Sequence, residues 1–535
     1  MLTNQNMLLK FTDLTHAQLI EEIMKLIIQN NELKEEFKKL KDENERLKKE
    51  IIKIKKLDEK PNIQPSILEK KPQEHSTTKK RQNNKGSKVI DLKIDRIKEI
   101  HISETELPEG ANFKGFKEKT VQELIIKTET TLYRIAKYLL PDGKYIFAEE
   151  PDSVKGWSFG PELRSYIVYQ NFTNRVTQQK IFEELIEFGI KISEGEINRI
   201  IEQTLELVQQ EKNDLLVAGI KTKNLQVDDT GGRHKGKNCY STVICNDFFT
   251  YIKTTAKKSR INFLELLQGN KLDYVITQET INYLKKYNFG SKINIIQNLI
   301  GKKFNDFEEL DNFIKKNLFG KTLRKAIIEG ALIGALIMNG FDKNTSIMSD
   351  GAGQFHLFSN ILCWVHKERP LKALLPLNDI DQIEIEQIRK DFWEFYQKLK
   401  IYKLNPDLNK KLFLTNEFDK IFSKITTELP LSLILKSIRD DKEKLLRILD
   451  DSTVPLHNNL SEINIREMVI KRKISAGTKS DKGRDSRDAF ISLNKTCKKL
   501  GIPFWQYLND RVAKRNQIIY LPEFILQKHY LSLRN

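Results

Sequence analysis

The chain has 535 residues, enough for two to four domains, and its 39% hydrophobic and 31% charged residues suit buried cores beneath a charged surface. No run of 18 apolar residues occurs and the N-terminus lacks a signal-peptide pattern, which argues against a membrane protein. The 91 Lys and Arg residues exceed the 73 Asp and Glu residues, and the net charge of +18 favours a polyanionic partner, nucleic acid before a membrane surface. A lysine-rich proteome would explain the same excess. Four scattered cysteines without a C-x-x-C pair indicate a reducing cytoplasm.

Residues 1–57 are predicted to form a coiled-coil dimerisation helix, because apolar residues recur with a 3.5-residue period. Asn30 and Asn44 interrupt the apolar seam, a choice that favours two strands in register. Glutamates at the g positions precede lysines at the following e positions, as in a parallel pair. We therefore expect a parallel homodimer or larger assembly. A lone charged helix that packs on its own protein is the alternative. The apolar seam positions are Leu19, Ile23, Leu26, Leu33, Phe37, Leu40, Leu47, Ile51 and Ile54.

Two segments link this helix to the rest of the chain. Residues 58–97 read as a basic linker, which either touches DNA backbone or serves only as a solvated tether. Residues 98–150 are expected to form a small β unit around the hairpin-turn dipeptide Asp142-Gly143. Its strand-like residues are Val121, Leu124, Ile126, Tyr133, Ile135 and Tyr138.

Residues 151–220 are predicted to be helical, with helices near 161–172, 176–188 and 193–212. Ser193 is expected to cap the third helix, with Glu196 at the capping-box position. A short glycine-containing turn joins the last two helices. This arrangement indicates a helix-turn-helix-like DNA-binding region, and a plain helical bundle explains the same residues equally well.

The remainder alternates strands and helices. Residues 221–369 are expected to contain strands near 224–229, 239–245, 248–254, 345–349 and 360–365, with an apolar helix at 324–339. A helical insertion follows at 370–455, and residues 456–535 close the chain with helices near 485–514. Three antiparallel strands, a helix, a strand, a helix and another strand is the order of an α/β ribonuclease-H-like catalytic core in two parts.

Three acidic residues occupy selected places in that order. Asp228 lies on the first strand, Asp350 follows the fourth strand, and Glu462 lies at the start of a late helix. Carboxylates gathered in this way suit two Mg²⁺ ions, since hard cations prefer oxygen ligands and a phosphodiester supplies the others. Asp229 is the alternative first ligand, on the opposite face of the same strand. Spacing alone is a weak signal in a chain with 73 acidic residues.

Several segments, taken in this order, resemble the transposases of the insertion-sequence-66 family. The likeness runs from about residue 110 to residue 510. It is carried by Gln226–Gly236, Lys258–Leu264, Ser349–Phe355, Cys363–Arg369, Asn458–Glu462, Arg472-Lys473 and Ala476–Asp481.

The resemblance implies a DDE-type DNA transposase that binds the inverted ends of its element, cuts them and joins them to target DNA. Asp228, Asp350 and Glu462 would hold two Mg²⁺ ions, for which Mn²⁺ substitutes. The protein would lie in the bacterial cytoplasm, at the nucleoid when bound. A catalytically silent, transposase-derived DNA-binding protein is the alternative.

Basic residues near the acids are expected to hold DNA phosphates. Arg466 lies one helical turn from Glu462, so an ion pair with Glu462 within the helix explains Arg466 as well as a DNA contact does. The expected DNA contacts are Arg233, His234, Lys235, Lys258, Arg260, His366, Arg466 and Lys473.

No zinc site is predicted. Many members of the family carry a cysteine zinc-binding unit before the helical region, but residues 98–147 contain no cysteine, so the β unit would be a degenerate zinc ribbon. Cys363 and His366 are only two potential ligands, too few for a zinc site. We favour His366 as a group that supports the acids or touches DNA, with a core histidine beside Trp364 as the remaining possibility.

Overall fold

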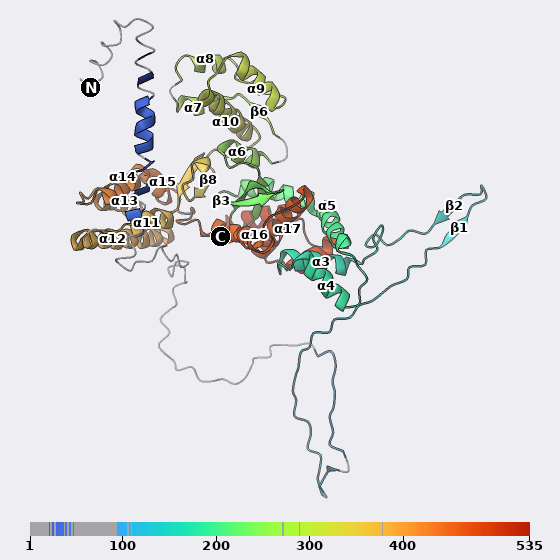
Figure 1. Ribbon diagram of the computed structural model, residues 1–535. Coiled ribbons are helices and arrows are strands. Elements are labelled where there is room, and N and C mark those ends of the chain that lie inside the picture. Colours follow the sequence, from blue (N-terminus) through green and yellow to red (C-terminus); the bar gives the residue numbers. More distant parts are fainter. Residues whose placement is uncertain are drawn as a thin grey trace. The chain divides into compact units, whose positions relative to one another are not determined.

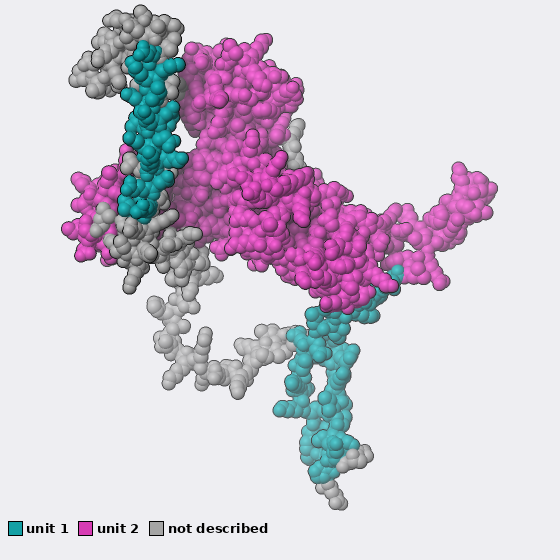
Figure 2. Space-filling model, viewed as in Figure 1, with its two compact units in different colours: residues 1–131 teal, residues 132–535 magenta. Residues whose placement is uncertain are grey.

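The computed structural model describes residues 94–534, apart from 104, 105, 109, 270, 271, 288 and 377, together with a discontinuous set between residues 21 and 47. The chain divides into two compact units, residues 1–131 and residues 132–535 (Figure 2). No helix among the described residues is long and apolar enough to cross a membrane.

In the first unit, the described residues between 21 and 47 are all helical. Most of the predicted coiled-coil seam and nearly all of the linker lie outside the described residues. Of the seam, Leu33 and Leu47 are described and are 65% and 51% exposed. Where residues 94–131 are described, they contain no strand, and the expected strand residues Val121, Leu124 and Ile126 are exposed. Alternating apolar residues form a strand only when a neighbouring strand or layer covers them.

The second unit begins with a hairpin of two short strands, β1 (Lys137–Leu139) and β2 (Tyr145–Phe147). The predicted Asp142-Gly143 turn joins them: Gly143 has a φ of +81°, and Asp142 accepts a hydrogen bond from the Lys144 amide at 3.0 Å. The strands pair antiparallel, with Tyr138 opposite Ile146. All six strand residues are exposed.

A five-stranded mixed sheet with the order β5-β4-β3-β8-β9 forms the centre of this unit (Figure 1). Three antiparallel strands, β3 (Leu225–His234), β4 (Lys237–Cys245) and β5 (Thr250–Thr255), are followed by the parallel β8 (Ser346–Ser349) and β9 (Ser359–Leu362). With its many helices, this mixed sheet fits a ribonuclease-H-like domain. The fifth strand is shorter than the expected 360–365, because a helix begins at Trp364.

Helices before and after the sheet pack against one another. They are α3 (Pro161–Phe172), α4 (Gln178–Glu187), α5 (Glu194–Gly219), α16 (Asn459–Ser475), α17 (Asp481–Leu500), α18 (Phe504–Val512) and α19 (Leu521–Ser532).

Ser193 caps α5 and accepts a hydrogen bond from the Glu196 amide, as expected. The face of α5 towards α3, α17 and α19 is buried, and its first turn carries two acidic residues, Glu194 and Glu196. The helix-turn-helix reading of α4 and α5 stays a prediction.

The helix α17 lies along the free edge of β5. Asp488 accepts a hydrogen bond from the Thr254 amide at 2.6 Å, Ser492 from the Ile252 amide at 2.9 Å, and Thr496 from the Thr250 amide at 3.0 Å. Every fourth residue of a helix rises about 6 Å, and every second residue of a strand about 6.6 Å. The two spacings match closely enough for three successive contacts.

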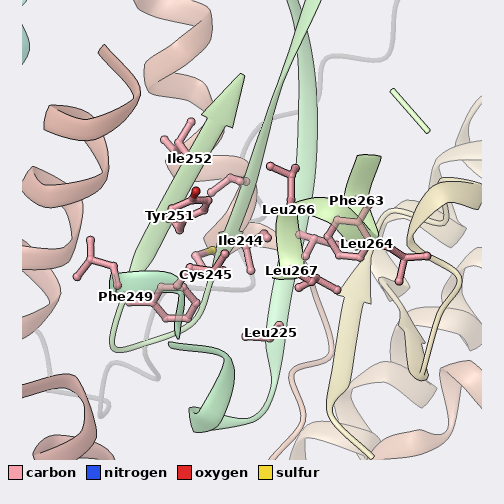
Figure 3. Packing of buried hydrophobic residues seen from close by; sticks show 14 of the residues in the cluster. Leu225, Ile244, Cys245, Phe249, Tyr251, Ile252, Phe263, Leu264, Leu266 and Leu267 are labelled. Carbon is pink, nitrogen blue, oxygen red and sulfur yellow. The ribbon is translucent and has the colours of Figure 1, made fainter. Parts of the chain in front are cut away.

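Between β5 and β8 the chain builds a second helical layer. It contains α6 (Arg260–Gln268), α7 (Gln278–Lys285), α8 (Lys292–Gln297), α9 (Phe307–Lys316) and α10 (Lys321–Met338), with a small sheet of β6 (Tyr274–Val275) and β7 (Lys303–Phe304). Figure 3 shows Leu264 and Leu267 of α6 in one apolar cluster with Leu225 of β3 and Ile244 of β4. This packing fixes α6 beside the strand that carries Asp228.

A separate apolar core holds the helices after β9 together. They are α11 (Trp364–Lys372), α12 (Asp379–Leu404), α13 (Leu408–Phe422), α14 (Leu429–Asp440) and α15 (Lys442–Leu445). The fully buried Trp364 lies among aromatic rings and donates its indole N–H to the Leu445 carbonyl at 3.0 Å.

Candidate active site

Asp228 lies in the middle of the sheet, on β3. One carboxylate oxygen accepts a hydrogen bond from the Asp229 amide at 2.8 Å. Burial raises the pKa of Asp228 to about 7, and the negative charges of Asp350, Asp229 and Glu462 add to this rise. The charges of the other two acids of the predicted triad therefore act on Asp228.

Asp350 reaches the same level of the sheet from the neighbouring strand. In the parallel register Gln226 lies beside Met348. Asp228 lies two positions after Gln226, and Asp350 lies two positions after Met348, so the two acids are at matching positions along the sheet. The Asp350 side chain turns back on its own loop, where it accepts a hydrogen bond from the Ala352 amide at 2.9 Å. Gly351, with a φ of +103°, permits this sharp turn at the strand end.

Glu462 lies in the first turn of α16, and two side chains of α11 hold it. One carboxylate oxygen lies 3.2 Å from His366 Nε2 and 3.2 Å from Arg369 Nη2. Burial and the charge of Arg369 lower the pKa of His366 despite the nearby acids. The alternative ion pair between Glu462 and Arg466 does not form: Arg466 is exposed and has no ion-pair partner among the residues that the structure describes.

Asn458 joins the elements that carry these groups. It is fully buried, and its side-chain amide donates a hydrogen bond to the Val227 carbonyl at 2.9 Å. Its backbone amide donates to Cys363 Sγ at 3.3 Å. Asn458 thus connects the residue before Asp228, the residue before α11 and the start of α16.

Cys363 and His366 face different partners. Burial raises the pKa of Cys363 to about 11, so its thiol stays protonated and faces the amide of Asn458. His366 instead approaches Glu462. His366 therefore contacts one of the predicted catalytic acids and does not point towards the thiol as a fellow ligand.

Asp229 has both carboxylate oxygens engaged by protein. Lys258 lies 2.7 Å from one oxygen, and Gln354 donates a hydrogen bond to the other at 2.6 Å. Burial disfavours the charged Lys258, but Asp229, Asp350 and Asp228 outweigh it and raise the pKa of Lys258. Lys258 therefore remains a cation at the edge of the acidic site.

The other predicted DNA contacts divide into two groups. Arg260 points into the protein, where it donates to the Tyr283 hydroxyl at 2.9 Å and to the Gly353 carbonyl at 2.6 Å. It thus supports the loop after Asp350. Four further residues, Arg233, His234, Lys235 and Lys473, lie near the tip of the β3–β4 hairpin or at the end of α16.

The acidic site offers the carboxylate oxygens that divalent cations prefer as ligands. Among the residues described, no three His, Cys, Asp or Glu side chains are close enough to hold one metal ion. Mg²⁺ typically takes one or two carboxylates plus water and phosphate oxygens, so pairs of acids suffice. Burial, more than the neighbouring acids, raises the pKa of Asp228, and a cation bound there would favour its charged form.

Sequence reasoning missed three residues of this site. Asn458 and Arg369 lie inside segments that carry the family resemblance, yet their partners are residues 231 and 93 positions away. Gln354 likewise acts through Asp229, 125 positions away. Only the tertiary structure reveals these contacts.

Two comparisons with known proteins identify sequences that this chain resembles. A family model described as "Transposase IS66 family" matches residues 325–486, a span that includes Asp350 and Glu462 but not Asp228. The chain is also 35% identical over 322 residues to the uncharacterized protein y4jO of Sinorhizobium fredii (strain NBRC 101917 / NGR234). That match spans 57% of this chain and 97% of the relative.

Proposed function

The chain belongs to the transposase IS66 family, and from this membership we propose that it is an active DDE-type DNA transposase. It would bind the inverted terminal repeats of its element, cut the DNA strand and transfer the freed end to target DNA. Asp228, Asp350 and Glu462 are the proposed catalytic acids.

The observation that carries this proposal is the electrostatic influence on Asp228 of Asp350 and Glu462, two acids from distant segments. Asp228 lies on β3 and Asp350 directly follows the adjacent parallel strand β8. Burial raises the pKa of Asp228, and the charges of Asp350 and Glu462 raise it further. A protein that only binds DNA does not need carboxylates that repel one another, whereas a metal-dependent nuclease needs them to hold its metal ions.

Asp228, Asp350 and Glu462 would hold two Mg²⁺ ions, because their carboxylate oxygens are the ligands that this hard cation prefers. Magnesium there would activate a water or a 3′-hydroxyl and stabilise the leaving oxygen. The surrounding residues keep the acids in place: Arg369 and His366 orient Glu462.

Asp229 serves a different role in this proposal. Its ion pair with Lys258 and its hydrogen bond from Gln354 connect β3 to α6 and to the loop after Asp350. Both of its oxygens are already satisfied, so Asp228 is the better first ligand.

Duplex DNA is the proposed partner, and self-association through residues 1–57 would bring two ends together. The net charge of +18 suits the polyanion. One protomer for each end is the simplest arrangement, and the exposed Leu33 and Leu47 are available to a second helix.

The test is a Mg²⁺-dependent cleavage and strand-transfer assay on duplexes that carry the terminal repeats of the element. Wild type is compared with Asp228→Asn, Asp350→Asn and Glu462→Gln, and with Asp247→Asn, an exposed acid in the β4–β5 turn, as the control. We expect the three site variants to bind DNA without cutting and the control to behave as wild type.

A second readout does not depend on catalysis. Mg²⁺ should raise the Tm of the wild type and of Asp247→Asn, because a ligand of the native state stabilises it, but should not raise the Tm of Asp228→Asn. A wild type that binds the ends yet neither cuts nor responds to Mg²⁺ is a silent DNA-binding protein. Loss of cutting in Asp229→Asn with normal activity in Asp228→Asn would reverse our choice of first ligand.

A further inference from the structure

The tip of the β3–β4 hairpin is joined to the segment between α16 and α17. Thr478 forms a parallel bridge with His234, in which the Lys235 amide donates to the Thr478 carbonyl at 2.8 Å and the Thr478 amide donates to the Arg233 carbonyl at 3.1 Å. The Thr478 hydroxyl also lies 2.8 Å from His234 Nδ1. We call residues 231–237 and 472–481 the basic junction.

Gly477 makes this close contact possible. A Cβ atom at Gly477 would lie 2.5 Å from the Arg233 carbonyl oxygen, too close for any side chain. Ala476 before it has a φ of +58°, so the chain turns sharply as it leaves α16. The two segments are therefore fixed against one another by backbone contacts as well as by side chains.

The basic junction carries six Lys and Arg residues and a single acid, Asp481. His234 Nε2 lies 3.0 Å from Asp481, and Lys235 and Arg484 pair with the same carboxylate. The acid is thus already neutralised within the protein. The exposed cations without a carboxylate partner among the described residues are Arg233, Lys237, Lys473 and Lys479.

We propose that the basic junction binds the phosphate backbone of duplex DNA about six base pairs from the phosphate that is cut. The proposal rests on the proposed function for the position of the cut. Several unpaired cations on a rigid backbone platform are what sequence-independent phosphate contacts require.

Two independent lengths set the distance from the acids. His234 follows Asp228 by six residues of β3, about 20 Å at 3.4 Å per residue. Lys473 follows Glu462 by eleven residues of α16, about 16 Å at 1.5 Å per residue. At 3.4 Å per base pair, these lengths correspond to about five or six base pairs.

The experiment measures binding to the terminal-repeat duplex in EDTA, where no cutting occurs, over a range of salt concentrations. The triple variant Lys237→Ala/Lys473→Ala/Lys479→Ala should lower the slope of log K against log salt by about 2 to 3, because each lost phosphate contact contributes about 0.9. The matched control is Lys390→Ala/Lys420→Ala/Lys436→Ala, which removes the same charge from exposed positions of α12, α13 and α14.

Phosphate-ethylation interference locates the contact. Wild type should show interference five or six base pairs from the cleaved phosphate, and the triple variant should lose those signals alone. If the slope fell equally in both triple variants, the effect would come from overall charge and the proposal would be overturned. An interference pattern that is unchanged in the junction variant would also overturn it.

A further variant tests the junction itself. Gly477→Ala keeps every charge but forces the two segments apart, and should erase the same interference signals while the Tm shows that the protein is folded. Junction contacts in a protein that never cuts would refute the proposed function and keep only the DNA contact of the basic junction, without its distance from a cut. Normal cutting without junction contacts would support the proposed function and refute this inference.

Discussion

The side-chain amide of Asn458 donates its hydrogen bond to the carbonyl of Val227, the residue that immediately precedes Asp228. Glu462 follows Asn458 by one helical turn. The buried side chain of Asn458 therefore links the strand that carries Asp228 to the helix that carries Glu462.

Replacement of Asn458 by alanine should therefore reduce strand cleavage more than DNA binding. The Val227 carbonyl would be left buried without its partner, at a cost of about 1–3 kcal/mol in unfolding free energy. Urea denaturation and the cleavage assay measure the two effects.

The matched control for this prediction is Asn246→Ala. Asn246 is also buried and donates to the Thr222 hydroxyl at 2.6 Å and the Lys223 carbonyl at 3.1 Å. Within the part of the chain that the structure describes, its side chain forms no hydrogen bond with the residues next to Asp228, Asp350 or Glu462. If both variants lose stability and cleavage in the same proportion, Asn458 has no positioning role beyond folding.

Arg369→Met should increase the affinity for Mg²⁺. Arg369 places a positive charge 3.2 Å from Glu462, and this charge competes with any cation at that carboxylate. The Mg²⁺ concentration that gives half of the Tm shift should fall severalfold.

Arg389→Met provides the comparison. Arg389 pairs with Glu368, which lies beside Arg369 on α11, and not with Glu462. An unchanged Mg²⁺ response in Arg369→Met would show that Glu462 is not a ligand in solution.

Lys212→Met should stabilise the protein at neutral pH. Burial lowers the pKa of Lys212 to about 8 from an ordinary 10.5, and its ammonium lies 4.0 Å from the centre of the Tyr251 ring. Below pH 8 the folded protein bears the full cost of a buried charge, about 3 kcal/mol for such a difference in pKa.

That cost disappears as the pH rises from 8 to 10.5, because the lysine loses its proton in the folded and then in the unfolded protein. The difference in unfolding free energy between Lys212→Met and wild type should shrink over this range, measured by urea denaturation. Lys221→Met, at an exposed position, should show no such pH dependence. A constant difference between pH 7 and pH 10.5 would contradict the assignment.

Leu33→Glu combined with Leu47→Glu should abolish self-association if residues 1–57 form a coiled coil. Charges at two seam positions would face one another across the helix pair. Light scattering of the full chain measures the mass, and Glu35→Ala, at a position away from the seam, is the control. A dimer that persists in the double variant would place the interface elsewhere.

The sequence predicted the parts of the sheet that are strongly patterned. The strands around Asp228 and before Asp350 are rich in apolar and β-branched residues, and both form where expected. The fifth strand was overextended, since Cys363-Trp364-Val365 reads as a strand although Trp364 begins a helix. Burial of that indole in the core of the helical insertion decides the conformation, and a local pattern does not contain this information.

The role of Arg260 shows a second limit. A basic residue near the acids reads as a phosphate ligand, and its DNA contact stays a prediction, but the local pattern does not reveal that Tyr283 and Glu329, on later helices, contact its guanidinium. The pleat alternation that separates Asp228 from Asp229 depends only on neighbouring residues, and the choice of Asp228 as first ligand stays a prediction. Contacts within a strand are predictable from the sequence, whereas partners contributed by distant helices are not.

The three acceptors of α17 along β5 have a consequence for copies of this protein at high concentration. The edge amides of Thr250, Ile252 and Thr254 are the groups through which a foreign strand would extend the sheet, and side chains of the same chain already occupy them. A second copy therefore finds no free amide at these three positions with which to pair a strand. The helix α17 thus protects this edge of the sheet from intermolecular strand pairing.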